Sequence, residues 1–489
     1  MKNVYIPPSE ELVNYENTPE YTYAVKKLVQ EAATLPENIK NRKIWMINST
    51  EHGGGVAEML PKMVCLLREL GLDTEWLVME SDDIDFFKIT KKIHNMVHSH
   101  PEEEITPDEI AVYEHTAREN ARLLMKMVNP GDIVIIHDPQ PLGIPLFMDK
   151  SDIFFIWRCH IGTEVINEFT KHVWDVLKKY SPPYRHAVFS APEYIPDFFA
   201  GRSSVIYPAI DPVSHKNRPL LAHKLTGILC NSRLATEHHP VLTPRFEHPA
   251  LRLQKDGYFL PADLPEDTGL IYRPIVSQIS RWDKLKGFIP VLKAFIEIKS
   301  NPDKYSSGKD RRHQKRLEIV RLVLAGPSPD SVADDPEAEM VLEEIIEIYK
   351  NLPENIQNDI AIIRLPMNSR KENMLMVNAI QRCSTLILQN SFQEGFGLTV
   401  TEAMWKGITV IGSPATGIRQ QIRSGIDGVL LKNPEDTTEL ADNINELLAD
   451  SLRRIRLGEN ARRRVYDDFL VFSQLSKWIN LLGTKILPP

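Results

Sequence analysis

Short apolar runs alternate with longer stretches of helical spacing over most of the chain. Near the C-terminal end, Cys383–Gln389 is almost wholly apolar, Leu398–Lys406 repeats apolar residues at helical intervals, and Thr409–Ile411 is again apolar. Such apolar runs predict strands buried on both faces, and a strand–helix–strand crossover makes its two strands parallel. Gly407 stands where a helix C-terminal cap is favoured. The pattern therefore predicts a parallel α/β unit at 383–411.

The same alternation recurs in both halves of the chain. In the first half, a helix over Val56–Leu70 lies between two strands, and a capping box at Thr106–Glu109 begins a helix to about Val128. The predicted strands of this half, which make a first sheet of about six, are Lys43–Asn48, Glu75–Met79, Asp132–Asp138, Ile153–His160, His186–Ser190 and Ser204–Pro208. In the second half, the further predicted strands are Pro274–Ser280, Glu318–Gly326, Ile360–Leu365 and Val429–Leu431.

Segments without this alternation mark the domain organisation. Tyr207–Leu220 carries three prolines and several turn residues, which places a hinge between two large domains. Residues 1–41 are a polar lead-in with one amphipathic patch, Tyr23–Ala33, and Asn301–Arg316 is predicted to be a surface loop. Residues 221–269 precede the second domain proper, and a lid or a contact between subunits is the expectation for them.

Composition and charge narrow the class of protein. The 489 residues carry 58 Lys and Arg against 66 Asp and Glu, a formal charge of −8, which argues against nucleic acid or an anionic membrane as the main partner. No apolar run reaches the ~20 residues that span a bilayer, and the acidic, polar N-terminus does not resemble a secretory signal. The four cysteines are scattered without a close pair, which favours free thiols and a cytoplasmic location. His238 and His239 adjoin each other without further spaced ligands, so no metal site is predicted.

Two acids near the predicted crossover are the first candidates for chemistry. Glu394 lies in the turn after the strand and Glu402 lies on the helix, whose first residues Gly397, Leu398 and Thr399 offer free backbone N–H groups. Those N–H groups suit a phosphate, and carboxylates accept hydrogen bonds from hydroxyls. A ligand that is both phosphorylated and hydroxylated, such as a nucleotide sugar, fits this arrangement. The alternative is that Glu394 only caps the helix and that Glu402 faces solvent.

Polar groups at other strand exits are further candidates, because ligands bind at the carboxyl ends of strands in open α/β sheets. His137 and Asp138 end one predicted strand, and Arg158 and His160 end the next. A glycine loop, His52–Gly55, follows the first strand, with a simple tight turn as the alternative. A basic turn, Arg281–Gly287, follows the strand at 274–280, with a solvated surface turn as the alternative.

The sequence EGFGLTVTEAM, at 394–404, resembles the paired-glutamate motif of the retaining GT-B glycosyltransferases of family 4, and EGFGLTVTEAMWKG is similar to its trehalose glycosyltransferring synthases. The resemblance covers most of the chain outside 1–40 and 221–269. It implies a GT-B fold of two Rossmann-like domains whose parallel sheets face each other across a cleft. The implied domains are 1–215 on the acceptor side, a linker with insertion at 216–270, a nucleotide-sugar domain at 271–470, and a C-terminal helix at 471–489 that packs back on the first domain.

The resemblance also implies roles for individual residues. The pattern S-R-x-D-x-x-K-G places Arg281 and Lys286 on the donor diphosphate, and GGGVAE is similar to the family's glycine loop, which places the donor-binding Gly54 and Gly55 close to the donor pyrophosphate or to the acceptor sugar. Gly326, at the exit of its predicted strand, is expected to border the base of the donor. Glu402 would bind the ribose hydroxyls, and Glu394 would bind the transferred sugar. In WRCHI, His160 would contact that sugar, whereas Asp138, Gln140 and Arg158 would bind the acceptor.

The implied activity is a metal-independent, retaining transfer of glucose from a nucleoside-diphosphate glucose to a sugar acceptor, with trehalose as the expected product. No cofactor is expected beyond these substrates, and a homodimer is left open. A trehalose phosphorylase that uses phosphate, and transfer to a polyol or glycerate, are the alternatives on the same fold. A non-enzymatic sensor of nucleotide sugars is disfavoured because all four charged residues of the implied donor site are present, namely Arg281, Lys286, Glu394 and Glu402. A dehydrogenase is disfavoured because no Rossmann glycine fingerprint occurs.

Overall fold

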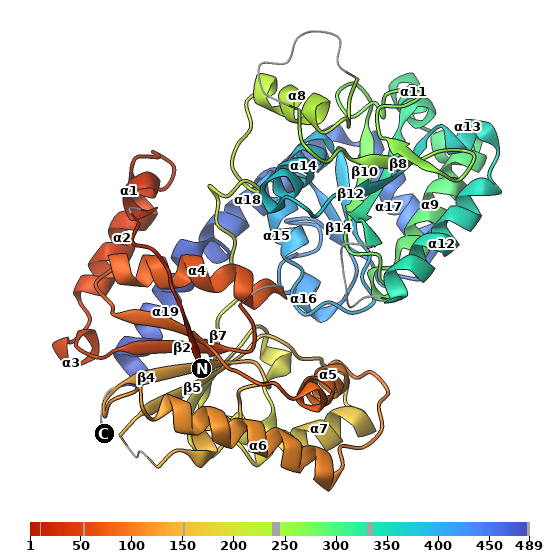
Figure 1. Ribbon diagram of the computed structural model, residues 1–489. Coiled ribbons are helices and arrows are strands. Elements are labelled where there is room, and N and C mark those ends of the chain that lie inside the picture. Colours follow the sequence, from red (N-terminus) through yellow and green to blue (C-terminus); the bar gives the residue numbers. More distant parts are fainter. Residues whose placement is uncertain (10, 52–53, 150–151, 237–244, 330–335, 487–489) are drawn as a thin grey trace. The chain divides into compact units, whose positions relative to one another are not determined.

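The protein forms two compact units, residues 1–209 together with 471–489, and residues 210–470 (Figure 1). The computed structural model describes residues 1–9, 11–51, 54–149, 152–236, 245–329 and 336–486. Each unit is built on one sheet whose strands are mostly parallel. The predicted α/β class with two parallel sheets is confirmed.

The sheet of the first unit has seven strands in the order β1-β3-β2-β4-β5-β6-β7. All neighbouring pairs are parallel except β1 with β3, which is antiparallel. The strands are β1 (Lys2–Val4), β2 (Ile44–Asn48), β3 (Thr74–Val78), β4 (Ile133–His137), β5 (Phe154–Cys159), β6 (Tyr184–Phe189) and β7 (Ser203–Val205). The lead-in thus supplies an edge strand, which raises the predicted six strands to seven.

Helices cover both faces of this sheet, because its central strands are buried at every position. In β2, Trp45 and Ile47 join the core formed with the helices of one face, whereas Ile44 and Met46 point to the other face. The helices are α1 (Glu11–Glu16), α2 (Thr22–Ala33), α3 (Glu37–Lys40), α4 (Gly54–Glu69), α5 (Ile84–Val97), α6 (Pro107–Leu124) and α7 (Glu168–Lys178). Short 3-10 turns follow at η1 (Ile144–Phe147), η2 (Pro192–Tyr194) and η3 (Asp197–Phe199).

The last helix, α19 (Val471–Lys485), belongs to the first unit. It packs against α2 and α4, and its ring of Phe472 lies 4.9 Å from Tyr15 and 5.7 Å from Tyr21, centroid to centroid. Trp478 is buried in the same helix. The amphipathic patch at Tyr23–Ala33 corresponds to α2, which is one of the surfaces that α19 covers.

The sheet of the second unit has eight strands in the order β15-β14-β13-β10-β11-β12-β8-β9. The six strands from β15 to β12 run parallel, and β8 and β9 are antiparallel. The strands are β8 (Leu251–Leu253), β9 (Phe259–Pro261), β10 (Ile275–Ile279), β11 (Arg321–Pro327), β12 (Ile360–Leu365), β13 (Leu386–Gln389), β14 (Val410–Gly412) and β15 (Val429–Leu430).

Two hydrophobic clusters cover the two faces of this second sheet. Val276 and Leu324 belong to the cluster on the face of α9, α12 and α17, whereas Ile275 and Val323 belong to the cluster with α8 and α14. The helices are α8 (Ala222–Asn231), α9 (Phe288–Ser300), α10 (Pro302–Ser306), α11 (Arg311–Ile319), α12 (Pro336–Lys350), α13 (Glu354–Gln357), α14 (Arg370–Cys383), α15 (Leu398–Trp405), α16 (Thr416–Arg419), α17 (Thr437–Ala449) and α18 (Ser451–Asp468), with a 3-10 turn at η4 (Lys284–Lys286).

Residues 251–261, which precede the predicted nucleotide-sugar domain, are part of the second sheet. The hairpin β8–β9 pairs with β12, where Arg364 lies opposite Leu251. For residues 251–261 the expectation of a separate lid is therefore wrong. His238 and His239 lie outside the described residues.

The surface loop predicted over Asn301–Arg316 is also wrong, because α10 and α11 occupy most of it. Asp310 caps α11 by accepting a hydrogen bond from the His313 backbone N–H, and Tyr305 and Leu317 are buried. The many charged residues of this segment are the exposed faces of two short helices. The strand predicted over Glu318–Gly326 begins only at Arg321, as β11, because Glu318 belongs to α11.

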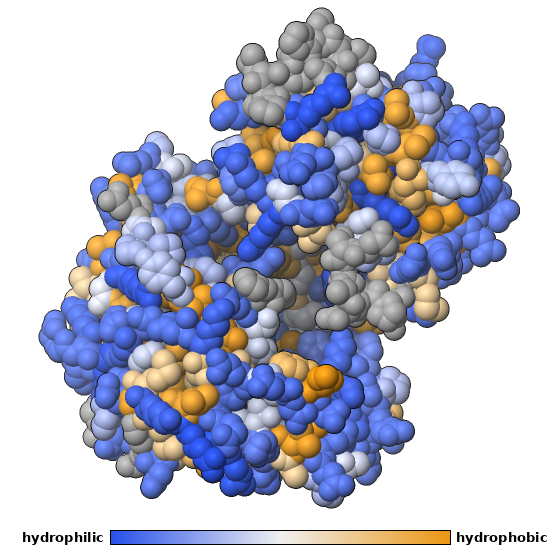
Figure 2. Space-filling view, in the orientation of Figure 1, coloured by the Kyte–Doolittle hydropathy of each residue, from blue (hydrophilic) through white to orange (hydrophobic). Residues whose placement is uncertain are grey.

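The surface in Figure 2 is mainly hydrophilic, with apolar residues in small groups. Among the described residues, no helix combines the length and the apolar character needed to cross a membrane. The four cysteines are free thiols.

Candidate active site

The crossover from β13 to α15 holds the predicted paired acids. Between them the chain turns at Gly397, whose φ of +83° is left-handed and which precedes the first residue of α15. A Cβ atom at this position would lie 2.8 Å from Cγ of Glu394. Glycine is therefore needed both for the turn and for the space that the Glu394 side chain occupies.

One backbone N–H group of α16 and one side chain that follows this helix hold the loop before α15. The Gln421 amide donates to the carbonyl groups of Phe396 and Gly397, and the Gly417 N–H donates to the Glu394 carbonyl at 3.1 Å. A Cβ atom on Gly417 would lie 2.4 Å from the Phe396 Cα atom. This contact explains a glycine that motif reasoning did not select.

Lys286 and Glu394 form an ion pair, with 2.8 Å between Nζ and Oε2. Both side chains are largely buried, and the Ser391 hydroxyl donates to the same carboxylate oxygen at 3.0 Å. The two loops contact directly, since the Phe392 N–H donates to the Leu285 carbonyl at 2.7 Å. The structure thus brings together a predicted cation and a predicted acid.

Arg281 lies on the same loop as Lys286, directly after β10. Its side chain is 59% exposed and lies 3.6 Å from the Asp283 carboxylate. Gly326, in β11, lies against this loop, because a Cβ atom there would be 2.6 Å from the Ser280 carbonyl and from the Trp282 ring. The Trp282 indole N–H donates to the Pro327 carbonyl at 2.8 Å. In this structure Gly326 therefore makes room for the loop that carries Arg281.

The first turn of α15 offers two backbone donors. The N–H groups of Leu398 and Thr399 make no hydrogen bond with any described residue, as is usual for the first turn of a helix. They lie directly after Gly397, whose turn is packed on Glu394. The positive end of the helix dipole lies at these N–H groups, so the start of α15 favours an anion, whereas the charge of Lys286 is offset by Glu394.

Glu402 is buried in α15 at 3% exposure, which rules out the alternative that it faces solvent. Its Oε1 atom lies 2.9 Å from Nζ of Lys216, while its Oε2 atom is buried and has no hydrogen-bond partner among the described residues. Lys406 donates to the Glu402 carbonyl at 3.2 Å and to the Asn217 side chain at 3.4 Å. Burial lowers the pKa of Lys406 to about 7, although the nearby Glu402 carboxylate opposes the shift.

Lys216, Asn217 and Lys406 were not selected from the sequence. Lys216 and Asn217 lie in a stretch, YPAIDPVSHKN, that resembles the family linker, and Lys406 lies in the motif EGFGLTVTEAMWKG, but neither resemblance assigned these residues a role. Composition gave no reason to pair a hinge lysine with Glu402.

In the first unit, the exits of β4 and β5 bring together Asp138, Arg158 and His160. Asp138 adopts a left-handed φ of +64°, accepts the His160 N–H on its carboxylate at 2.7 Å, and donates its own N–H to the Arg158 carbonyl at 2.9 Å. Aspartate is one of the residues that tolerate this backbone conformation. Burial raises the pKa of Asp138 to about 6, although the Arg158 charge and the hydrogen bond oppose the shift.

The two histidines of this site form a neutral pair. His137 Nδ1 lies 3.0 Å from His160 Nε2, and the rings are stacked with 5.3 Å between centroids. Burial lowers the pKa of His137 to about 3 and that of His160 well below its ordinary value, with the Arg158 charge adding to both shifts. Neutral imidazoles suit hydrogen bonding to hydroxyl groups better than ion pairing.

Three buried polar atoms of this region have no hydrogen-bond partner in the described part of the chain: His137 Nε2, Gln140 Oε1 and Arg158 Nη1. Arg158 donates to the Ser190 hydroxyl through Nη2 at 3.3 Å, and burial lowers its pKa to about 10. Unpaired buried polar atoms cost free energy unless a ligand or water satisfies them. The set contains both donors and acceptors, as a polyhydroxylated ligand requires.

The predicted glycine loop is described only in part. Gly54 and Gly55 are the first residues of α4, and a Cβ atom on Gly55 would meet nothing within 4 Å. His52 and Gly53 lie outside the described residues. No group of three or more His, Cys, Asp or Glu side chains that could hold a metal ion occurs in the described parts of the chain.

The family model "Trehalose synthase, N-terminal domain" matches residues 46–196, and "Glycosyl transferases group 1" matches residues 270–464. The trehalose synthase of Pyrococcus horikoshii is 30% identical over 93% of this chain and 92% of its own length. The chain belongs to the trehalose synthase group of glycosyltransferases.

A phosphorylase and a solved synthase structure are also similar to this trehalose synthase homologue. The trehalose phosphorylase of Pleurotus pulmonarius is 25% identical over 92% of this chain, which corresponds to 58% of the phosphorylase. The crystal structure of a UDP-forming α,α-trehalose-phosphate synthase from Burkholderia vietnamiensis aligns with a TM-score of 0.63 at 15% identity, over 90% of this chain and 98% of that one. This structural likeness confirms the GT-B fold.

The matched regions divide the site residues of this trehalose synthase homologue in two. His137, Asp138 and His160 lie in the first matched region, whereas Lys286, Glu394 and Glu402 lie in the second. Lys216 and the hairpin β8–β9 lie between the two matched regions.

Proposed function

We propose that the protein transfers glucose, with retention of configuration, from a nucleoside-diphosphate glucose to glucose, giving trehalose. The observation that carries the proposal is the buried Lys286–Glu394 pair beside the N–H groups of Leu398 and Thr399, which donate to no described residue. It combines anion-binding groups with a carboxylate that accepts hydroxyl hydrogen bonds. The membership in the trehalose synthase group supports the choice of sugar.

In this proposal the second unit holds the donor. Arg281, Lys286 and the first amides of α15 bind the diphosphate, whose negative charge grows as the glycosidic bond to it breaks. Glu394 accepts hydroxyls of the transferred glucose. Glu402, whose Oε2 atom is unpaired, accepts hydroxyls of the ribose. Gly326 of the second unit, and Gly54 and Gly55 of the first unit, also lie beside the donor in this proposal.

In the first unit, His160 contacts the transferred glucose, and Asp138, Gln140 and Arg158 bind the acceptor. The unpaired atoms of His137, Gln140 and Arg158 support a polyhydroxylated ligand here. The acceptor hydroxyl attacks the anomeric carbon from the face that the diphosphate leaves. Its proton passes to a leaving-group oxygen, so no protein nucleophile is needed, in contrast to a retaining glycosidase.

The proposal requires no metal ion, because Arg281 and Lys286 supply the positive charge that a divalent cation would otherwise provide. Turnover is expected to continue undiminished after dialysis against a chelator. Loss of activity that added Mg²⁺ restores would contradict this part of the proposal.

Replacement of Glu394 tests the central assignment. Glu394→Gln keeps the size of the side chain but removes its charge, and turnover of nucleoside-diphosphate glucose is expected to fall by about 100-fold or more. Glu435→Gln, at an exposed position of the same unit, is the matched control and should keep normal turnover. Near-normal turnover of a correctly folded Glu394→Gln protein would remove the assigned role.

A trehalose phosphorylase is the second candidate, favoured by the match to the phosphorylase of Pleurotus pulmonarius. In that reaction inorganic phosphate would occupy the diphosphate position beside Lys286. Release of nucleotide from ADP- or UDP-glucose with glucose, compared with release of phosphate from glucose 1-phosphate with glucose, separates the two. The same assay with a polyol or glycerate, followed by mass spectrometry, tests the remaining acceptors.

A further inference from the structure

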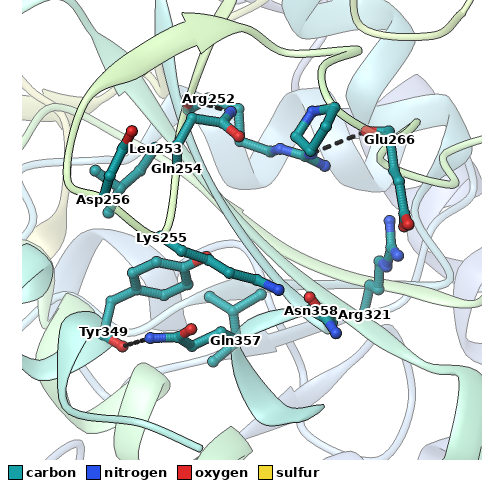
Figure 3. A pocket seen from close by; sticks show the side chains of 12 residues that line it. Arg252, Leu253, Gln254, Lys255, Asp256, Glu266, Arg321, Tyr349, Gln357 and Asn358 are labelled. Atoms are coloured by element: carbon teal, nitrogen blue, oxygen red, sulfur yellow. Dashed lines mark hydrogen bonds between the residues drawn. The ribbon is translucent and has the colours of Figure 1, made fainter. Parts of the chain in front are cut away.

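A cavity of about 320 Å³ lies in the second unit beside the turn of the hairpin β8–β9 (Figure 3). Its walls include Arg321 and Ile360, the first residues of the parallel strands β11 and β12. Lys286 and Glu394 follow the carboxyl ends of the parallel strands β10 and β13 of the same sheet, whereas the cavity lies at the amino ends of β11 and β12. The cavity is therefore separate from the candidate active site.

The cavity is lined mainly by polar and cationic side chains. Figure 3 shows those of Arg252, Gln254, Lys255, Arg321, Tyr349 and Asn358 around it. A volume of this size falls at the lower end of the range for small-molecule sites. Residues 252–266, which form one wall, lie between the two regions that match family models.

Arg321 carries a charge that the surrounding protein does not fully compensate. Its side chain is 5% exposed, Nη1 donates to the Asp267 carbonyl at 2.8 Å, and Nε is buried without a hydrogen-bond partner in the residues that the structure describes. The carboxylate of Asp359 lies 4.0 Å from that Nε atom, too far for a hydrogen bond. Asp359 is already paired with Lys299 at 2.8 Å and Arg273 at 3.2 Å. The single carboxylate of Asp359 thus lies near three cationic side chains.

Arg252 adds a second guanidinium to the cavity wall. Its Nη2 atom donates to the carbonyls of Leu264 and Glu266, both at 2.8 Å, and its other N–H groups donate to no described residue. Burial lowers the pKa of both arginines. Repulsion by Arg321 adds to the shift of Arg252, which the carboxylates of Asp267 and Glu266 oppose. Repulsion by Arg273 adds to the shift of Arg321, which the carboxylates of Asp359 and Glu266 oppose. A bound anion would relieve this repulsion.

The remaining groups favour an anion that also carries hydroxyls. The Gln254 amide donates through Nε2 to the carbonyls of Arg252 and Leu264, which leaves its oxygen as an acceptor. The side-chain amide of Asn358 is uncommitted to any described residue. The exposed carboxylates of Asp256 and Glu266 also line the cavity, and they would repel a bare anion but accept hydroxyl donors.

We propose that this cavity binds a small phosphomonoester that carries hydroxyl groups, of the sugar phosphate class, with its phosphate on Arg252 and Arg321 and its hydroxyls toward Gln254, Asn358 and Glu266. The site does not depend on the proposed transfer reaction.

Titration calorimetry of the full-length protein with glucose 6-phosphate tests the site, with glucose and inorganic phosphate as separate probes. Glucose 6-phosphate is expected to bind more tightly than either of the other two. Hydrogen exchange should then slow in peptides that cover residues 251–261. Absence of binding, or equal affinity for glucose 6-phosphate and either simpler probe, would overturn the phosphomonoester assignment.

Variants locate the bound ligand. Arg252→Gln should weaken binding roughly tenfold or more, since it removes a charge-assisted contact. Lys255→Glu should weaken binding of glucose 6-phosphate severalfold. Lys255 is 48% exposed and pairs with Glu354 at 2.6 Å, so this change tests the site even if Arg252→Gln does not fold. Lys315→Glu is the matched control, because Lys315 is 69% exposed and pairs with Glu318 at the same distance.

Lys286→Ala separates this site from the candidate active site. Binding of glucose 6-phosphate should persist in that variant even though transfer activity is lost. Loss of binding in Lys286→Ala together with full binding in Lys255→Glu and Arg252→Gln would place the ligand at the active site and overturn the proposal.

Discussion

The space around Glu394 depends on the absence of a side chain at Gly397. Other glycines of the same unit share its left-handed backbone, yet they differ in what a Cβ atom would meet. At Gly425, with φ of +79°, a Cβ atom would find nothing within 4 Å, whereas at Gly397 it would lie 2.8 Å from Cγ of Glu394. Backbone strain and steric contact can therefore be measured separately at these two positions.

Gly425→Ala is expected to lower the free energy of unfolding by about 1 kcal/mol through backbone strain alone, with normal turnover. Gly397→Ala should cost more than that, and turnover should also fall because the added methyl group displaces Glu394. Chemical denaturation and steady-state kinetics of both variants check this. Equal losses of stability with full activity in both variants would show that the contact has no consequence.

Glu394 and Lys286 were predictable because each lies in a short string that resembles a family motif and follows a recognisable strand. Their direct pairing was not predictable, since it depends on the packing of two loops from distant parts of the sequence. Lys216 shows the limit more clearly. It reaches Glu402 from the segment predicted to be a hinge, and no local periodicity links a lysine there to an acid on α15.

At the scale of elements, α15 packs against α18 where two glycines meet. A Cβ atom on Gly458 of α18 would lie 2.0 Å from the carbonyl oxygen of Gly407, the residue that ends the α15 turn. Because that oxygen belongs to the backbone, it cannot move aside as a flexible side chain would. The close approach of these two helices therefore requires glycine at 458.

Gly458→Ala is expected to destabilise the protein by about 1–3 kcal/mol, although alanine is the better helix former by about 1 kcal/mol. Gly483→Ala in α19 is the control, because its Cβ atom would meet only the Leu35 side chain, at 3.1 Å. That control should be close to neutral. Thermal unfolding of the two variants gives the comparison, and a stabilised Gly458→Ala protein would contradict the contact.

Lys406, which follows the last residue of α15, should make stability depend on pH. Its pKa is about 7 in the folded protein, below the ordinary value of 10.5, so the unfolded chain binds more protons between these two values. Stability should therefore rise from about pH 7 to pH 10.5, by up to about 1.4 kcal/mol per pH unit from this group. Below about pH 7 the full cost of charging the buried amine remains.

Lys406→Met keeps an apolar stem of similar length and should remove this contribution. Urea unfolding of both proteins at pH 7, 8 and 9 measures it, because the other titrating groups cancel in the difference. Parallel dependence on pH in the two proteins would show that Lys406 keeps an ordinary pKa.

Elements were easiest to predict where apolar periodicity was strong. The strands that became β2, β4, β5, β10, β12 and β13 lie in such runs, and each was located to within a few residues. The helices α10 and α11 were missed, because few of their residues are buried and charged residues dominate the rest. The hairpin β8–β9 was missed because its short strands obtain their place from pairing with β12 rather than from their own pattern.

At the scale of the whole molecule, the chain passes from the first unit to the second near residue 210 and returns near residue 470. Each unit has its own sheet and hydrophobic clusters, so unfolding as a single two-state transition is not required. α19 is the element that makes the first unit discontinuous in sequence. Its contribution can be tested by truncating one buried side chain.

Trp478→Ala should destabilise the first unit by about 3–5 kcal/mol, because the indole is 2% exposed in the packing of α19. Hydrogen exchange measured by peptide should become faster in β2 and β4 and stay unchanged in β10 and β11. Asn480→Ala, at an exposed position of the same helix, is the control. Equal acceleration in both sheets would mean that the two units unfold together.

The return of the chain to the first unit has a consequence for biosynthesis. A ribosome makes residues 1–209 before the second unit, yet it makes α19, which covers α2 and α4, after the second unit. A nascent chain halted just before Val471 would hold every residue of the second unit while the earlier-made unit still lacked a helix. Of the two units, the one whose translation begins earlier is therefore the one that is completed later.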